Sequence, residues 1–212
     1  MPTSPMLPLL EEVTARHYPN APATPAQLEE FEQRVGWRLD EDLRAFYLHC
    51  DGATLFRPWP NQTFWLLPLR EVRRARVAMR FRDEDAMGSP HWWTIADLGD
   101  DDYSVLDASR PGDAYPILDA YHETYPQQVV QIAPSFGAWL ERTLRSNNQL
   151  WWLPEPENDS GAPERTGASR WLMKRLAPRP ELTRPAQVHP KPLVTPPSPW
   201  PHAGQGAPRP AW

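Results

Sequence analysis

The chain of 212 residues contains a single cysteine, Cys50. One cysteine excludes an internal disulfide framework and any metal site built from several thiolates, and it fits a reducing compartment. The chain has no apolar run of about 18 residues, the length that a membrane-spanning helix needs. Its first residues also lack the basic start and unbroken apolar core of a signal peptide. We therefore expect a cytoplasmic protein without membrane contact.

Lysine is absent from residues 1–150, which carry 22 Asp and Glu against 14 Arg. Such an acidic surface repels phosphates, so direct binding of nucleic acid is not expected, and a cationic partner is favoured. The sequence also has no G-x-S-x-G nucleophile motif and no glycine-rich phosphate loop. We accordingly predict a non-enzymatic protein with no catalytic residues, no cofactor and no metal site.

Proline is the residue in excess, with 28 copies, and its density changes along the chain. Residues 1–150 contain 14 prolines, and the 62 residues that follow contain the other 14. A segment so rich in proline buries too little apolar surface to offset the entropy lost on ordering. We predict one folded domain over residues 1–153 and a largely disordered tail over 154–212, with a short helix near 167–177 as an option.

Hydrophobic spacing places helices at both ends of the folded part and strands between them. Residues 24–27 form a capping box, and the apolar residues after it recur at helical intervals up to Gly36. This order predicts the α+β class, with N-terminal helices packed on a central mixed or antiparallel sheet and a C-terminal helix. The expected helices are 9–18, 25–35, 41–51, 71–82 and 136–144, and the expected strands are 64–69, 92–96, 103–106, 115–118 and 129–132.

Three segments, 23–52, 92–107 and 114–144, carry motifs in a familiar order. They are an L-E-x-x-E helix with a second aromatic helix, a strand-loop-strand unit rich in Gly and Asp, and a strand followed by a final helix. Together they resemble the SUKH superfamily, the Smi/Knr-type cell-wall-assembly-regulator domain, although Asp40 and Asp51 replace its usual Pro and Asn. The resemblance implies a small α+β domain over roughly residues 9–153 with no known catalytic chemistry. It also implies two roles: bacterial members are typically immunity proteins that block a cognate toxin, often a nuclease, and fungal relatives are scaffolding regulators.

Four carboxylates, those of Asp97, Asp100, Asp101 and Asp102, crowd into six positions between two predicted strands. Such a run is typical of a solvated hairpin loop, and its spacing differs from that of a calcium-binding loop. The alternative is contact with a protein partner, because carboxylates can take the place of phosphates in a basic nuclease cleft. We take these four residues as candidates for partner binding.

Other side chains have both a structural and a functional interpretation. His122-Glu123 lacks the second histidine of a zinc motif, so the pair is expected to orient backbone at a sheet edge, and Glu123 is kept as a candidate for partner contact. Trp59 and Trp92 are aromatic candidates for core or interface anchors, and strand alternation puts Trp92 and Trp93 on opposite faces.

Six arginines between residues 70 and 82 predict a solvated helix face that pairs with Asp83, Glu84 and Asp85, and the alternative is contact with an acidic partner. Cys50 lies on the apolar stripe of its helix and is expected to be buried and unreactive.

These observations lead to one main hypothesis and one alternative. The main hypothesis is an immunity protein that covers the active site of a cationic toxin. The alternative is a regulatory scaffold whose proline-rich tail supplies a ligand for aromatic-lined grooves of cytoplasmic partners. The oligomeric state is left open.

Overall fold

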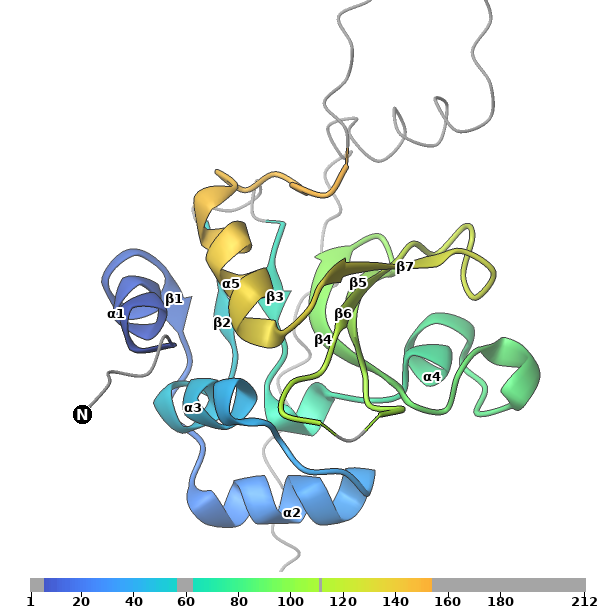
Figure 1. Cartoon of the computed structure of the whole chain (residues 1–212), viewed down its shortest axis with the longest axis horizontal. Coiled ribbons are helices and arrows are strands. Elements are labelled where there is room, and N and C mark those ends of the chain that lie inside the picture. Colours follow the sequence, from blue (N-terminus) through green and yellow to red (C-terminus); the bar gives the residue numbers. More distant parts are fainter. Residues whose placement is uncertain (1–5, 57–62, 111, 154–212) are drawn as a thin grey trace, which may run out of the picture. The chain divides into compact units, whose positions relative to one another are not determined.

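The structure is a computed structural model that describes residues 6–56, 63–110 and 112–153 (Figure 1). Trp59, the predicted tail 154–212 and its optional helix lie outside the described residues. In chain order the elements are α1 (Met6–Arg16), β1 (Tyr18–Pro19), α2 (Pro25–Val35), α3 (Glu41–His49), β2 (Ala53–Thr54), β3 (Trp65–Leu66), the 3-10 turn η1 (Leu69–Glu71), α4 (Ala75–Arg80), the 3-10 turn η2 (Asp85–Met87), β4 (Trp92–Gly99), β5 (Asp102–Asp107), β6 (Ile117–Ala120), β7 (Val129–Ala133) and α5 (Phe136–Arg145). Helices before and after a run of strands confirm the predicted α+β class.

Capping residues define the ends of α2 and the start of α3 at the positions that the sequence predicts. The Thr24 side chain accepts a hydrogen bond from the backbone N–H of Gln27, and the Gln27 side-chain oxygen accepts one from the backbone N–H of Thr24, which completes the capping box. Gly36 ends α2 with φ +80°, a conformation that favours glycine. Asp40 begins α3 by accepting the Leu43 N–H at 2.8 Å. Local sequence therefore fixes the ends of these helices.

The strands form one antiparallel sheet in the order β1-β2-β3-β4-β5-β6-β7. Each strand thus pairs with its neighbour in sequence, so only short connections are needed. The first three strands have two residues each, and β4 and β5 make the longest pairing. Gly52 allows β2 to approach β3 closely, because a Cβ at that position would lie 2.6 Å from the Leu66 carbonyl oxygen. Strands β1 and β2 were not predicted from the sequence.

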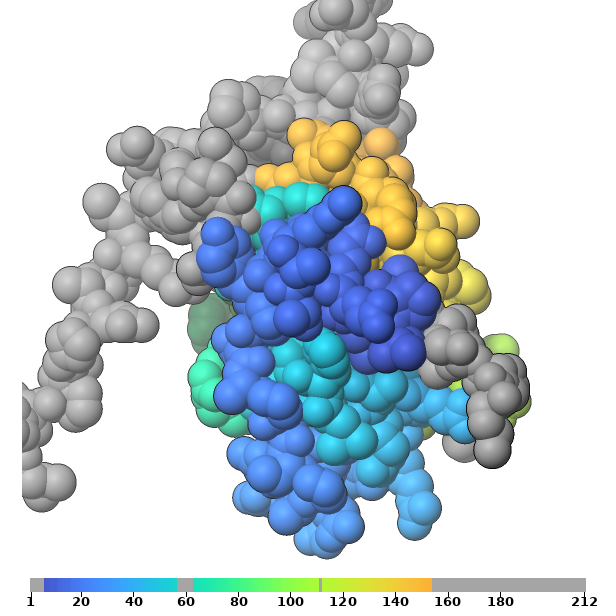
Figure 2. All heavy atoms as spheres, turned by 90° about the vertical axis from the view of Figure 1, so that its left-hand side faces the viewer, coloured from blue at the N-terminus to red at the C-terminus, as the bar shows by residue number. Residues whose placement is uncertain are grey.

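Apolar side chains pack on both faces of the sheet. The larger cluster joins α1, α2, α3 and α5 to one face and includes Trp93 and the fully buried Trp139. A smaller cluster joins α4 to the other face through Tyr103, Val105 and Tyr125. The atoms of α1, α2, α3 and α5 form one continuous surface in Figure 2. Hydrophobic burial on both faces accounts for the position of the sheet in the core.

The predicted helix 71–82 is wrong over its first half. The chain forms η1 and then an extended stretch in which Arg74 bridges to Trp93, and Thr94 N–H donates to the Arg73 carbonyl. Helix α4 therefore has six residues only. The pairing of this stretch with β4 is a long-range interaction that helical spacing of apolar residues does not reveal.

The predicted solvated arginine face is also corrected. Arg76 is buried, with 6% of its side chain exposed, and its guanidinium contacts Asp83 at 2.5 Å and Asp85 at 2.8 Å. Arg80 donates to the backbone carbonyls of His122 and Tyr125. The pairing with Asp83 and Asp85 was predicted, but these two arginines hold α4 to its surroundings and do not form a solvated face.

Candidate functional site

The acidic segment after β4 is a tight hairpin turn. Gly99 pairs with Asp102, so Asp100 and Asp101 are the two central residues of the turn. Both have positive φ angles, 51° and 60°, as a two-residue turn of the primed type requires. Aspartate tolerates this conformation better than most residues. The two residues are exposed at the tip of the longest hairpin in the sheet.

Asp102 is not part of an open acidic loop, which corrects the sequence-based prediction for this residue. It begins β5 and is only 2% exposed. One of its carboxylate oxygens accepts the backbone N–H of His122 at 2.9 Å and lies 2.9 Å from His122 Nδ1. Asp102 therefore anchors the chain that follows β6 to the start of β5.

This anchor brings Glu123 to the same end of the sheet as the turn. In an antiparallel sheet the end of β4, the start of β5 and the end of β6 lie together, as the pairing of Tyr103 with Ala120 shows. Glu123 follows His122 directly and is exposed. We call Asp100, Asp101 and Glu123 the acidic end. The structure thus places Glu123, which was predicted apart from the aspartates, at the same end of the sheet as Asp100 and Asp101.

Asp97 lies in β4 just before the turn, and unlike Asp100 and Asp101 it is half-buried. Its carboxylate accepts the Gly99 N–H at 2.7 Å, which stabilises an irregular step in β4. The residue is half-buried and pairs across the sheet with Tyr103 on one side and Trp65 on the other. Asp97 was predicted to lie in the loop, but it belongs to the strand.

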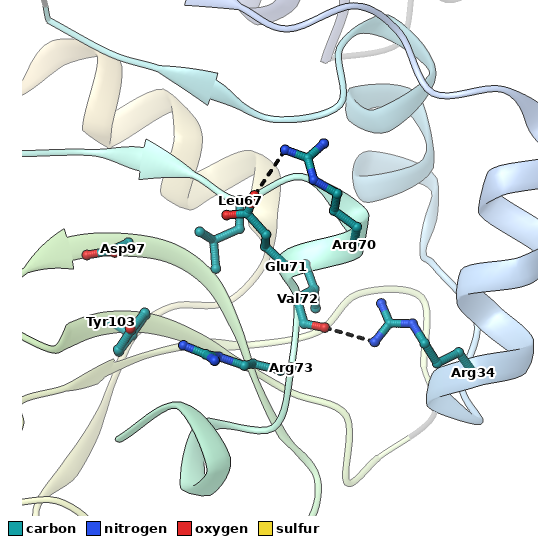
Figure 3. Close-up of a pocket in the computed structure, with 8 residues that line it drawn as sticks. All are labelled: Arg34, Leu67, Arg70, Glu71, Val72, Arg73, Asp97 and Tyr103. Atoms are coloured by element: carbon teal, nitrogen blue, oxygen red, sulfur yellow. Dashed lines mark hydrogen bonds and ion pairs between the residues drawn. The ribbon is translucent and has the colours of Figure 1, made fainter. Parts of the chain in front are cut away.

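A pocket of about 380 Å³ opens next to Asp97 and Tyr103 (Figure 3). Figure 3 shows the Arg73 side chain reaching along the sheet toward these two residues. Burial raises the pKa of Tyr103, the Asp97 carboxylate adds to the effect, and a hydrogen bond with Arg73 opposes it. The residues that line the pocket are Arg34, Leu67, Arg70, Glu71, Val72, Arg73, Asp97 and Tyr103.

Arg34 fixes the far wall of this pocket. Its guanidinium donates to the carbonyls of Leu69 at 2.7 Å and Val72 at 3.1 Å, which joins α2 to η1. Arg70 contacts Glu71 at 3.0 Å on the exposed rim. The lining therefore offers both guanidinium and carboxylate groups to a polar partner. No sequence pattern predicts this pocket, because Arg34 and Tyr103 come from elements that only the tertiary fold brings together.

The aromatic candidates do not join the acidic end. Trp92 pairs with Asp107 at the opposite end of β4 and β5 from the turn. Its ring is half-buried and meets Tyr125 edge-to-face at 6.0 Å. Trp93 lies on the other face and is 7% exposed, so the predicted difference between these two tryptophans is confirmed. Trp59 lies outside the described residues.

Within residues 6–56, 63–110 and 112–153, no three side chains of His, Cys, Asp or Glu gather as a metal ion would require. No helix there has the length and apolarity to cross a membrane. Cys50 is fully buried as predicted, and burial raises the pKa of its thiol to about 12.

A comparison with known protein families finds a match that covers both the acidic end and the pocket. No curated protein matches the chain. A sequence profile of the SMI1 / KNR4 family (SUKH-1) matches residues 22–142, which run from just before α2 into α5. This range contains Asp100, Asp101, Glu123 and every residue that lines the pocket. Because the profile covers more than half of the chain and the fold is the one that the sequence resemblance implied, the chain belongs to the SMI1 / KNR4 family (SUKH-1).

Proposed function

We propose that this chain is an immunity protein that binds a cognate toxin and covers its active site, with the acidic end as the primary contact. The family to which the chain belongs includes toxin immunity proteins. The observation that carries the proposal is the geometry of the acidic end: two aspartates lie on a two-residue turn, and the Asp102–His122 contact brings Glu123 to the same end of the sheet. Electrostatic complementarity of this kind speeds encounter with a cationic partner and fixes its orientation.

The turn is suited to binding because it is already ordered. Ordering a loop on binding costs free energy, and a turn fixed by strand pairing on both sides avoids most of that cost. The pocket next to Asp97 adds guanidinium and carboxylate groups at the border of the same surface. A partner that docks on the turn therefore also meets groups that bind its polar side chains.

The test removes the charge of the turn without changing its shape. The double variant Asp100→Asn, Asp101→Asn keeps residues that favour positive φ, so the hairpin is expected to persist. A matched control, Glu11→Gln with Glu141→Gln, removes two exposed carboxylates from α1 and α5. Neighbouring genes are first searched for one that encodes a large secreted protein, and the C-terminal domain of that protein then serves as the binding partner. Its association is measured by stopped flow at several salt concentrations.

We expect the turn variant to slow association by roughly tenfold at low salt, because steering by charge governs on-rates. The control should change the rate much less. The wild-type rate should fall as salt rises, since screening over about 8–10 Å removes the attraction. Equal rates for wild type and turn variant would exclude the acidic end as the contact surface.

A second candidate function rests on composition. Residues 151–212 contain 14 prolines, a content typical of segments that bind aromatic-lined grooves. A scaffold of this type would lose its partner when residues 154–212 are deleted. Toxin neutralisation by the remaining domain, with no loss of activity, would instead support the immunity role.

A further inference from the structure

The strand β7 forms an edge of the sheet, and its composition is unusual for an edge. Its residues, Val-Val-Gln-Ile-Ala, include no charge and no proline. Val130 is 62% exposed, and Gln131 beside it is also exposed. Within the described part of the chain no strand pairs with its outer side. Natural proteins usually protect such edges with charge, proline or short length.

The opposite edge of the same sheet shows that protection. Strand β1 has two residues, and one of them is Pro19, which has no N–H to donate. Strand β7 has five residues, and α5 begins after the two residues that follow it (Figure 1). The difference marks β7 as the edge that is open to another strand.

The register of the sheet determines which backbone groups of β7 point outward. The Asp107 N–H donates to the Pro116 carbonyl at 3.1 Å, so Pro116 faces β5. Successive residues of a strand direct their backbone groups to alternate sides, so Leu118 also faces β5 and Asp119 faces β7. Asp119 pairs with Val130, which therefore bonds inward. The N–H and C=O groups of Val129 and Gln131 consequently point away from the sheet.

This spacing is self-complementary. When two antiparallel copies of β7 meet on a twofold axis at Val130, Val129 of each copy lies opposite Gln131 of the other. Each such pair exchanges two hydrogen bonds, which gives four across the axis. The two exposed Val130 side chains then face each other on one side of the sheet, at the short Cα separation of a pair without hydrogen bonds.

We propose that the protein forms a symmetric dimer in which two β7 strands pair antiparallel about Val130 and join the two sheets into one. The occupant of the edge is a second copy of this chain, since a twofold axis at Val130 pairs the outward backbone groups of Val129 in each copy with those of Gln131 in the other. The inference goes beyond the proposed function and does not depend on it. The acidic end lies on the β4–β5 turn and the segment after β6, so it is not used in the pairing.

Charge gives the dimer a salt dependence opposite to that of toxin binding. Residues 1–150 of each copy have a net negative charge, so two copies repel each other at low salt. The paired strands themselves carry no charge. Added salt screens the repulsion and should strengthen the dimer, whereas the same salt should slow association with a cationic toxin.

The first experiment measures the mass of the full-length chain by analytical ultracentrifugation across a range of protein and salt concentrations. We expect a monomer–dimer equilibrium for the wild type that shifts toward dimer as salt rises. Val130→Lys places two like charges opposite each other and should weaken the dimer at least tenfold. Leu48→Lys, at an exposed apolar residue of α3, is the matched control and should dimerise like the wild type. A wild-type monomer under all conditions, or equal dimerisation by the Val130 variant, overturns the proposal.

A second experiment tests the register by disulfide formation. Val130→Cys should cross-link to itself under mild oxidation, because the two Cα atoms would lie within the range that a disulfide spans. Gln131→Cys should not, because its opposite residue is Val129 and its own counterpart lies beyond about 7 Å. The native Cys50 is fully buried and contributes no background. Cross-linking of the Gln131 variant alone, of both variants equally, or of neither contradicts pairing about Val130.

Discussion

Replacement of Asp102 tests whether this residue is structural, as its burial indicates, or part of the binding surface. Its carboxylate is 2% exposed and receives the His122 backbone N–H, with His122 Nδ1 at 2.9 Å from the same oxygen. Hydrogen bonds to a charged group contribute about 1.5–3 kcal/mol each, and a buried donor left without a partner costs about 1–3 kcal/mol. Because the His122 ring is partly exposed and can bond to water, we expect Asp102→Ala to lose about 3 kcal/mol of unfolding free energy.

Equilibrium unfolding in urea at pH 7, followed by tryptophan fluorescence, measures this loss. For a domain of this size about 3 kcal/mol corresponds to a decrease in Tm of roughly 6–12 °C. Asp102→Asn keeps the shape and one acceptor oxygen, so its loss should be smaller. The turn variant Asp100→Asn, Asp101→Asn should stay within about 0.5 kcal/mol of wild type, because these side chains are exposed. A wild-type stability for Asp102→Ala would refute the view that this carboxylate holds β5 to the chain after β6.

Three further predictions concern other buried groups. Burial lowers the pKa of His17, so near that pKa the unfolded chain binds a proton that the folded chain does not. The free energy of unfolding should therefore fall as the pH drops below about 6.5. His17→Asn should reduce this pH dependence in urea unfolding at pH 5 to 8. Gly88 has φ +113°, and a Cβ at this position would lie 2.3 Å from the Tyr125 hydroxyl oxygen. Gly88→Ala should therefore destabilise the fold by about 2–4 kcal/mol in the same assay. An unchanged free energy of unfolding would contradict this close packing. Cys50 is fully buried with a raised thiol pKa, so a thiol reagent should label it only as fast as the protein opens, and rapid labelling in native buffer would disprove this.

The fold explains how the domain presents the charges of Asp100 and Asp101 on a turn between two paired strands. Antiparallel pairing continues through Gly99 and Asp102, so the exposed carboxylates of Asp100 and Asp101 are separated from a regular strand by no more than one residue. The larger apolar cluster, which packs α1, α2, α3 and α5 on one face of the sheet, supplies most of the apolar burial that holds these strands in place. The proposed binding surface and the core are thus formed by the same strands, and the turn is positioned by the most extensive pairing in the sheet.

Local sequence was sufficient for the features that depend on neighbouring residues. The capping box at Thr24 and the left-handed Gly36 follow from hydrogen bonds and backbone preferences within a few positions, and the structure has both. The opposite placement of Trp92 and Trp93 follows from strand alternation alone. The α+β class follows from the order of helical and strand patterns along the chain, and each of these patterns can be recognised from local hydrophobic spacing.

Tertiary structure decided the features that depend on residues far apart in sequence. Asp102 was grouped with Asp100 and Asp101 by proximity, yet strand pairing turns it inward toward His122, 20 residues later. Extended pairing with β4 likewise replaced the first half of the predicted arginine-rich helix, and the pocket beside Asp97 required α2, η1 and the β4–β5 pair to meet. The free energy gained by burying one residue against another depends on their distance in space. A pattern of polar and apolar residues along the chain does not show which distant segment will pack against a given residue.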